Sequence, residues 1–448
     1  MVVTATIMVS IDLGRSFVQV APSVPFPRSS WRSSLEDDKF HAMRPSVAIP
    51  AGALLAWTSC ALLLSCVVSI PELLPQGATG GDAEADTGAE AGADVEAGAD
   101  VEAGVDADVG DVCPAGTEEC DGNTSNGCEV LSTDPLHCGR CGHSCLGGQC
   151  EQGACQPLSL ATGLGRVYGI VADNEFVYGT SAQGGRVWKV PVDGCADPGN
   201  CAEYLASPGE SYQDIAMDGA ALFFTDSVVG SVARVDKDGS NECTLASAQA
   251  WPVGIALHED YVYWCDRSAN QILRRSKECS GTNEFEVFAQ ADAPHFPRID
   301  GTGVYWTKAT GGLVSWANVD GVFSEPVWSG TGLGDLMFAP ALDDNWVYWR
   351  EGFFSATSGP GRLVRAPKDS SGSLQVLAEG QPSPRYVAVS DTHVYWTTSE
   401  SVRRVAKDGA AAAELLATGL SDPHGIVVDD SAVYVGLYFG EELLKIAK

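Results

Sequence analysis

A short apolar and aromatic motif recurs through the second half of the chain at intervals of 39 to 47 residues. This is the period of a β-propeller blade, a four-stranded sheet that buries its two faces only by stacking on neighbouring blades. The repeat therefore predicts an all-β ring of blades. Its seven copies are Val177-Tyr178, Phe223-Phe224, Val262-Tyr263-Trp264, Val304-Tyr305-Trp306, Val347-Tyr348-Trp349, Val394-Tyr395-Trp396 and Val433-Tyr434.

Each repeat divides into four short strands separated by turn residues. A first strand such as 254–257 precedes the aromatic strand, and a third strand such as 231–235 and an outer strand such as 244–246 follow it. The aromatic strand is apolar at consecutive positions, so both of its faces must be covered. We expect Val262 and Trp264 to face one neighbouring blade and Tyr263 to face the other.

The last repeat ends at Lys448 after three strands and lacks an outer strand. Residues 157–162, which precede the first repeat, are similar to the outer strand 415–418. We expect this N-terminal strand to complete the last blade and close a ring of seven blades, because closure removes exposed sheet edges. A six-bladed ring is the alternative.

Two repeats resemble those of known propeller families. Residues 223–226, followed by 232–234 and 238–239, resemble the YWTD repeat of low-density-lipoprotein-receptor propellers, and residues 252–256 are similar to NHL-type propellers. The resemblance extends over residues 156–448 and implies the fold. It does not imply the ligand, because Lys308 and Glu351 replace the aspartate in two blades and receptor propellers usually have six blades.

The chain before the repeats begins with residues 1–42, which we leave unassigned because Met43 would make an ordinary start for a signal peptide. Residues 45–71 carry no charge and are typical of a segment that inserts into a membrane. They contain Leu63-Leu64-Ser65-Cys66, which resembles the lipobox of bacterial lipoproteins. The resemblance implies a signal peptide at 43–65 and lipidation of Cys66. A permanent transmembrane helix is the alternative.

The next segment, 66–112, is of low complexity and contains eleven acidic and no basic residues between Gln76 and Val112. Such a segment cannot bury enough apolar surface to fold, and its charges repel one another. We expect a disordered tether; calcium buffering is the other interpretation.

A cysteine-rich module follows at 113–155, with little aliphatic residue content to form a core. Disulfides are the expected cross-links, although the spacing of the cysteines over 138–145 also suits zinc. The run 120–129 followed by 134–139 resembles a module of bacterial surface lipoproteins. Asp121, Asn123, Asn126 and Glu129 are calcium ligands or ordinary turn formers. Eight cysteines allow 105 pairings, which we leave open: Cys113, Cys120, Cys128, Cys138, Cys141, Cys145, Cys150 and Cys155.

Five further cysteines lie within the repeats. Cys195 and Cys201 flank a turn and are close enough in sequence for a hairpin disulfide. Cys243, Cys265 and Cys279 form an odd set, so that at least one thiol stays free, and Cys265 on an aromatic strand is the best candidate for a buried one.

Charge and cysteine content together indicate where the protein acts. The chain has 27 basic and 59 acidic residues. This acidic excess argues against a nucleic-acid-binding protein. The many cysteines and the export segment indicate an oxidising compartment. We therefore predict a cell-envelope protein that is held to the membrane by lipid and faces the periplasm or the exterior.

No contiguous catalytic motif is present, which fits a propeller site assembled from one residue per blade. The loops that enter the first strands form the candidate ligand rim, unless these residues are merely solvated. One hypothesis is a non-catalytic binding or scaffold protein that contacts a protein, glycan or small polar ligand. The other is an exported enzyme resembling virginiamycin-inactivating lyases or lactonases, with His295 or His424 as base and a metal on Asp214. The rim residues are Arg166, Tyr212, Asp214, Trp251, His295, Arg298, Arg385 and His424.

Overall fold

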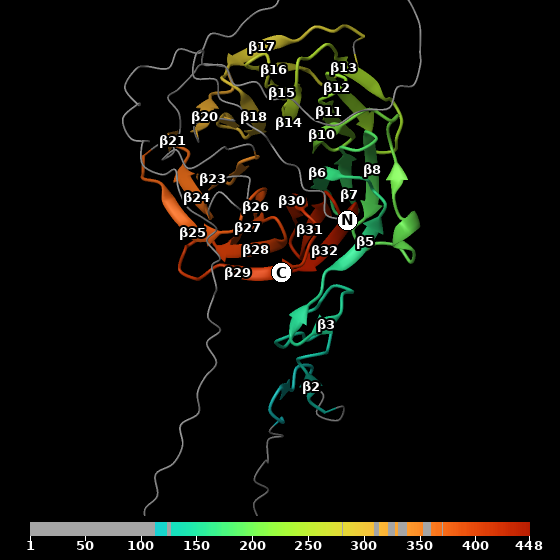
Figure 1. Ribbon diagram of the computed structural model, residues 1–448, viewed down its shortest axis with the longest axis vertical. Helices are drawn as coiled ribbons and strands as arrows, with labels where there is room; N and C mark the ends of the chain where they lie inside the picture. Colours follow the sequence, from blue (N-terminus) through green and yellow to red (C-terminus); the bar gives the residue numbers. More distant parts are fainter. Residues whose placement is uncertain are drawn as a thin grey trace, which may run out of the picture. The chain divides into compact units, whose positions relative to one another are not determined.

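The computed structural model describes residues 113–122, 127–279, 281–308, 313–320, 328–329, 338–352, 360–369 and 371–448. They form seven four-stranded antiparallel sheets arranged as a ring, preceded by two short hairpins (Figure 1). The predictions for 1–42, the signal peptide 43–65 with Cys66, and the tether 66–112 lie outside the described residues. Within these ranges no helix is long and apolar enough to cross a membrane.

The sheets are named blades 1 to 7 in chain order, with their strands given from the first to the outer strand. The first three blades are β6 (Val167–Ala172), β7 (Phe176–Ser181), β8 (Arg186–Pro191) and β9 (Glu203–Tyr204); β10 (Tyr212–Met217), β11 (Ala221–Asp226), β12 (Ser231–Asp236) and β13 (Cys243–Ala246); and β14 (Pro252–His258), β15 (Tyr261–Asp266), β16 (Gln271–Ser276) and β17 (Glu286–Gln290).

The next three blades repeat this order. They are β18 (Pro294–Ile299), β19 (Val304–Lys308), β20 (Leu313–Ala317) and β21 (Trp328–Ser329); β22 (Ala341–Leu342), β23 (Trp346–Glu351), β24 (Gly361–Pro367) and β25 (Gln375–Gln381); and β26 (Val387–Val389), β27 (His393–Thr397), β28 (Ser401–Ala406) and β29 (Glu414–Thr418).

Blade 7 closes the ring with strands from both ends of the propeller. It contains β30 (Pro423–Val428), β31 (Ala432–Leu437) and β32 (Glu442–Ala447), and its outer strand is β5 (Leu158–Thr162). The pairing of β32 with β5 is antiparallel, with Leu443 opposite Ala161. The predicted seven-bladed ring with N-terminal closure is thus confirmed, and the six-bladed alternative is excluded.

The aromatic strands form the core between blades, as their sequence predicts. Val262 and Trp264 pack in one cluster with Phe223 of blade 2, whereas Tyr263 packs in another with Trp306 of blade 4. Because each aromatic strand is covered on both faces, the strand has no solvent side and needs no polar alternation. The strand therefore buries its apolar surface only after the neighbouring blades have folded.

An aspartate at the end of the second strand organises the loops above it. The carboxylate of Asp226 accepts the backbone amides of Glu210 (2.8 Å), Val228 (3.0 Å) and Val229 (3.0 Å). This is the last residue of the YWTD-like motif, and its side chain is 1 % exposed. In blade 5, where Glu351 stands instead, the carboxylate pairs with Arg362 at 2.6 Å.

Ion pairs between adjacent blades lie at the turns between first and second strands. In blade 5 the Asp343 carboxylate accepts the hydroxyl of Tyr348 (2.7 Å) and the ammonium of Lys407 (2.6 Å), which belongs to blade 6. The pKa of this aspartate is lowered: burial acts to raise it, but Lys407 and the hydrogen bonds outweigh that effect. The same arrangement joins other neighbouring blades, at Asp173–Lys237, Asp218–Lys277 and Asp300–Lys368.

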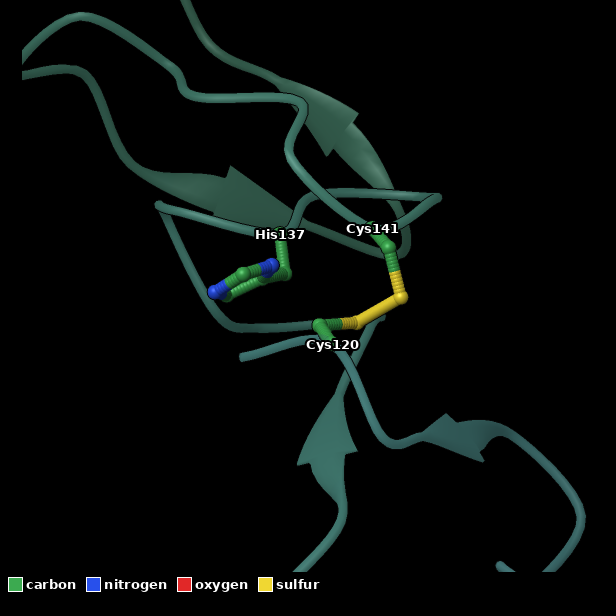
Figure 2. Close-up of side chains that lie close together, drawn as sticks. All are labelled: Cys120, His137 and Cys141. Carbon is green, nitrogen blue, oxygen red and sulfur yellow. A yellow bond between two sulfur atoms is a disulfide. The ribbon is translucent and has the colours of Figure 1, made fainter. Parts of the chain in front are cut away.

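The cysteine-rich module has two short hairpins, formed by β1 (Thr117–Glu118) with β2 (Glu129–Val130) and by β3 (Cys150–Glu151) with β4 (Ala154–Cys155). Figure 2 shows His137 beside one of its disulfides. Every cysteine of the module is oxidised, so none offers a thiolate to zinc, and the prediction of a disulfide-rich module is confirmed. The pairs are Cys113–Cys128, Cys120–Cys141, Cys138–Cys150 and Cys145–Cys155.

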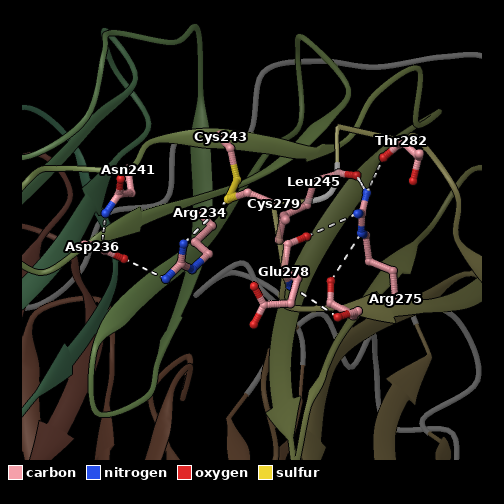
Figure 3. Close-up of a disulfide and its surroundings, with 10 residues drawn as sticks. Arg234, Asp236, Asn241, Cys243, Leu245, Arg275, Glu278, Cys279 and Thr282 are labelled. Atoms are coloured by element: carbon pink, nitrogen blue, oxygen red, sulfur yellow. Dashed lines mark hydrogen bonds and ion pairs between the residues drawn. A yellow bond between two sulfur atoms is a disulfide. The ribbon is translucent and has the colours of Figure 1, made fainter.

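Two disulfides lie within the propeller. Cys195–Cys201 spans the short 3-10 helix η1 (Pro198–Asn200), as predicted. Cys243–Cys279 joins the outer strand of blade 2 to the loop after the third strand of blade 3 (Figure 3). Beside it, the buried guanidinium of Arg275 in blade 3 donates to the Leu245 carbonyl of blade 2. Cys265 is the remaining thiol among the described cysteines, and it is buried, as expected.

Candidate functional site

A cavity of about 380 Å³ opens at the end of the ring where the chain enters the first strands. The loops that join second and third strands lie at the same end, and they contribute Arg267 and Tyr438 to the cavity wall. Its volume is in the range of pockets that hold small organic molecules. Much of the wall is aromatic: Tyr168, Trp251, Phe296, Phe338, Tyr438 and Phe439.

Each blade supplies a residue to this cavity from an equivalent position at, or a few residues before, the start of its first strand. The register shows the equivalence, since Pro252 opposes Asp266 in blade 3 and Pro423 opposes Leu437 in blade 7, and the lining residue follows directly in both. The seven residues are Tyr168, Gln213, Val253, His295, Phe338, Arg385 and His424.

A β-bulge after this position turns the lining side chain toward the axis. In blade 3 the bulge contains Gly254, whose φ is 127°, and a Cβ there would lie 2.5 Å from the Phe296 Cα atom of blade 4. Phe296 occupies the corresponding place in blade 4 with a φ of 43°. A bulky residue in the left-handed region is strained, and such strain is concentrated at functional sites.

The predicted rim residues fall into two groups. Trp251, His295, Arg385 and His424 line the cavity. The structure places Arg166, Tyr212, Asp214 and Arg298 outside the cavity lining. The sequence did not predict several other lining residues, namely Gln213, Val253, Arg267, Asp422 and the aromatic residues Tyr168, Phe296, Phe338, Tyr438 and Phe439.

Tyr212 packs on Phe224 in the core, with ring centroids 4.8 Å apart, and its hydroxyl donates to the Ser207 carbonyl. Asp214 and Arg298 form an ion pair of 3.3 Å and border a second cavity, of about 500 Å³, that is lined by the first strands. Arg166 is exposed and lies over the rings of Tyr438 and Phe439.

His424 contacts an ion pair on one side of the cavity. Its Nε2 atom lies 3.3 Å from a carboxylate oxygen of Asp422, which also pairs with Arg385. The imidazole is 5 % exposed and stacks on Tyr438, with centroids 4.6 Å apart. Burial lowers the pKa of His424 although Asp422 acts to raise it, so the ring is neutral at pH 7. A neutral imidazole held by a carboxylate is able to accept a proton.

Asp422 remains ionised within this group. Burial alone would raise its pKa, but the hydrogen bond with His424 and the charge of Arg385 hold the pKa below its usual value. The carboxylate therefore balances the charge of the arginine. The Asp422 backbone has a φ of 60°, which is uncommon for a residue with a side chain.

His295 lies on another part of the wall. Its Nδ1 atom is 3.2 Å from the Ala293 carbonyl, and burial together with the positive charge of Arg267 lowers its pKa to about 4. This histidine is therefore also neutral at pH 7. The Tyr168 phenol, which lines the same cavity, has a pKa raised to about 12, chiefly by burial. His295 and Tyr168 therefore each keep one charge state over the physiological pH range.

The module offers a separate group of candidate metal ligands. Carboxylate oxygens of Glu119, Asp121 and Glu129 lie within 4.8 Å of one another. Asn123 and Asn126, which the calcium prediction includes, lie outside the described residues. One oxygen of Glu129 is already hydrogen-bonded to the Cys120 amide at 2.8 Å. Calcium binding therefore stays a prediction.

No protein-family model matches the chain, and no curated protein does. Solved structures are similar in fold. Virginiamycin B lyase from Staphylococcus aureus is 16 % identical, with a TM-score of 0.52 over 65 % of this chain and 98 % of that one. A catalytically inactive histidine-to-alanine form of that lyase, solved with quinupristin, is 15 % identical with the same TM-score and coverage. Hydrazine synthase from Kuenenia stuttgartiensis gives 15 % identity and 0.52 over 64 % and 97 %. These likenesses show a β-propeller and leave its role open.

Proposed function

We propose that the propeller binds a small organic ligand in the cavity at its channel mouth. The observation that carries the proposal is that every blade contributes a lining residue, from an equivalent position, to one open-mouthed cavity of about 380 Å³. A protein or glycan partner would instead require an extended surface. Of the partners predicted from the sequence, the small polar ligand therefore fits the geometry best.

The test is a fragment screen on the full chain by ligand-observed NMR. Val253→Trp places a large ring in the cavity, so we expect it to abolish most of the binding seen with the unmodified protein. Val229→Trp makes the same change in an exposed loop and is expected to bind the same fragments. Circular dichroism checks that both variants are folded. If Val253→Trp binds the wild-type set of fragments, the cavity is not the site.

A second candidate function is catalysis in the same cavity, and the contact of His424 with Asp422 favours it. A neutral, oriented imidazole has the properties of a general base for a lyase or lactonase-like reaction. We expect any turnover of cyclic esters, followed by mass spectrometry, to fall at least 100-fold in His424→Gln. His393→Gln changes a histidine of blade 6 that is not among the residues lining the cavity and should leave turnover unchanged. Equal turnover in both variants would exclude His424 as the base.

The export prediction supports a role outside the cytosol. We propose that the protein is a lipoprotein of the cell envelope, built from YWTD-like or NHL-like repeats and anchored through Cys66. The six disulfides of the described residues support an oxidising compartment. Intact mass spectrometry of the protein from its native membrane tests this. A chain that begins at lipidated Cys66 is the expected result, and a chain that retains residues before it would refute the anchor.

A further inference from the structure

Among the described residues that line the cavity, the charges do not cancel, and Arg267 is the cation without a carboxylate partner. This inference rests on the proposed small-ligand site and concerns the class of ligand. Two other arginines near the axis are matched by carboxylates, since Arg385 pairs with Asp422 and Arg298 pairs with Asp214. Among the residues that the structure describes, no carboxylate lies within ion-pair distance of the Arg267 guanidinium.

The adjacent acid does not neutralise Arg267 by direct pairing. Asp266 is 3 % exposed, and its carboxylate accepts the backbone amides of Ala250 (2.7 Å), Trp251 (3.0 Å) and Ala269 (3.2 Å). The Asp266 carboxylate oxygens are thus occupied by backbone amides of the surrounding loops. The guanidinium instead lies over the Trp251 ring, 4.5 Å from the centroid. Stacking of this kind orients an arginine and leaves its edge N–H donors open to a ligand.

The charge of Arg267 is felt inside the cavity. Burial and this guanidinium together lower the pKa of the His295 imidazole, which belongs to the same cavity wall. A mouth with an excess positive charge is unexpected in a chain whose net charge is −32. In a concave site with apolar walls, the field of one cation is focused and attracts an anion.

The rest of the wall indicates what accompanies the negative charge. Phe296, Phe338 and Tyr438 give the wall an aromatic surface that suits a planar apolar body, and the volume of about 380 Å³ limits that body to a small one. A planar carboxylate matches the fork of N–H donors on a guanidinium. We infer that the ligand is a small aromatic or cyclic carboxylate monoanion whose oxygens bind Arg267 and whose ring lies against these aromatic residues.

Isothermal titration of the full chain with naphthalene-2-carboxylate and with the neutral naphthalene-2-carboxamide tests the inference, because the two probes share one ring system. We expect the carboxylate to bind at least ten-fold more tightly than the amide. In Arg267→Gln the affinity for the carboxylate should fall about ten-fold, which corresponds to about 1.4 kcal/mol. The affinity for the amide should be unchanged. The carboxylate affinity should also fall as salt is raised.

Arg186→Gln is the matched control, since this guanidinium lies over the Tyr204 ring at 4.9 Å and its residue is not part of the cavity wall. It should leave both affinities unchanged. Equal affinity of the two probes, no binding of either, or a preference for the carboxylate that survives in Arg267→Gln would each overturn the inference. The proposed site itself is tested separately, by the loss of fragment binding in Val253→Trp, so the two failures are distinguishable.

Discussion

Replacing Asp226 by asparagine removes a charge and one acceptor from a loop cap that is almost fully buried. The carboxylate accepts Glu210 N at 2.8 Å through one oxygen and Val228 N and Val229 N at 3.0 Å through the other. The side-chain amide of asparagine must point its NH2 group at the backbone amides on one of these two sides. The less costly orientation places the NH2 group against Glu210 N, because only that strong hydrogen bond is then lost. The charge-assisted hydrogen bond from Glu210 N is then lost, and those from Val228 N, Val229 N and, at 3.3 Å, Ser211 N are weakened, for a cost of about 3 kcal/mol.

Denaturant unfolding of the full chain, followed by tryptophan fluorescence, measures this cost. For a domain of this size about 3 kcal/mol corresponds to a fall in Tm of about 6 °C, which calorimetry checks independently. The control is Asp408→Asn, an exposed turn residue that accepts the Ala410 amide at 2.9 Å, where we expect a change of less than about 0.5 kcal/mol. If both variants unfold at the wild-type midpoint, the cap does not stabilise the blade and the reasoning is refuted.

Acid should destabilise the propeller through the aspartates of the ion pairs between blades. Burial acts to raise their pKa, but lysines and hydrogen bonds hold it below the usual value in Asp173, Asp218, Asp300 and Asp343. The stability that these carboxylates give is therefore present above about pH 4 and is lost as the pH falls through the folded-state pKa. A urea midpoint that does not decrease between pH 6 and pH 3 would contradict this. Replacing Cys243 and Cys279 together by serine should cost about 3 to 4 kcal/mol, because their disulfide closes a loop over a sequence separation of 36; an unchanged Tm would argue otherwise. Cys265 is fully buried and burial raises its pKa, so peptide mass mapping should find it alkylated only in denaturant; rapid labelling of the native protein would show that the strand opens.

The fold could be predicted because each repeat has a definite packing requirement in addition to a regular period. An aromatic strand that is apolar at consecutive positions, such as 262–264, can only lie between two other sheets. Counting its copies gave the number of blades, and the unpaired strand at 157–162 predicted the closure seen between β5 and β32. The disulfide pairing of the module was beyond prediction, since it depends on turns that bring distant cysteines together.

The site was predicted only in part because a β-bulge shifts the register where the first strand begins. Tyr212 and Asp214 were chosen from the sequence, yet Gln213 between them lines the cavity. In Pro252-Val253-Gly254 and Pro423-His424-Gly425 the lining residue precedes a glycine, and alignment of the repeats on this pattern would have identified it. Arg267 belongs to a loop between second and third strands, and the sequence pattern of the first strands gives no signal for that loop.

The pairing of β5 with β32 joins the first and last strands of the propeller. Its contact order is the highest that the fold allows, so the loop-closure entropy of nearly the whole domain must be offset before this contact forms. Blades 1 to 6 pair strands that are neighbours in sequence, and they are able to assemble in order along the chain, whereas blade 7 is complete only when β5 meets β32. The seam in blade 7 is therefore the expected rate-limiting step of folding and the place where a truncated chain would remain open to proteases.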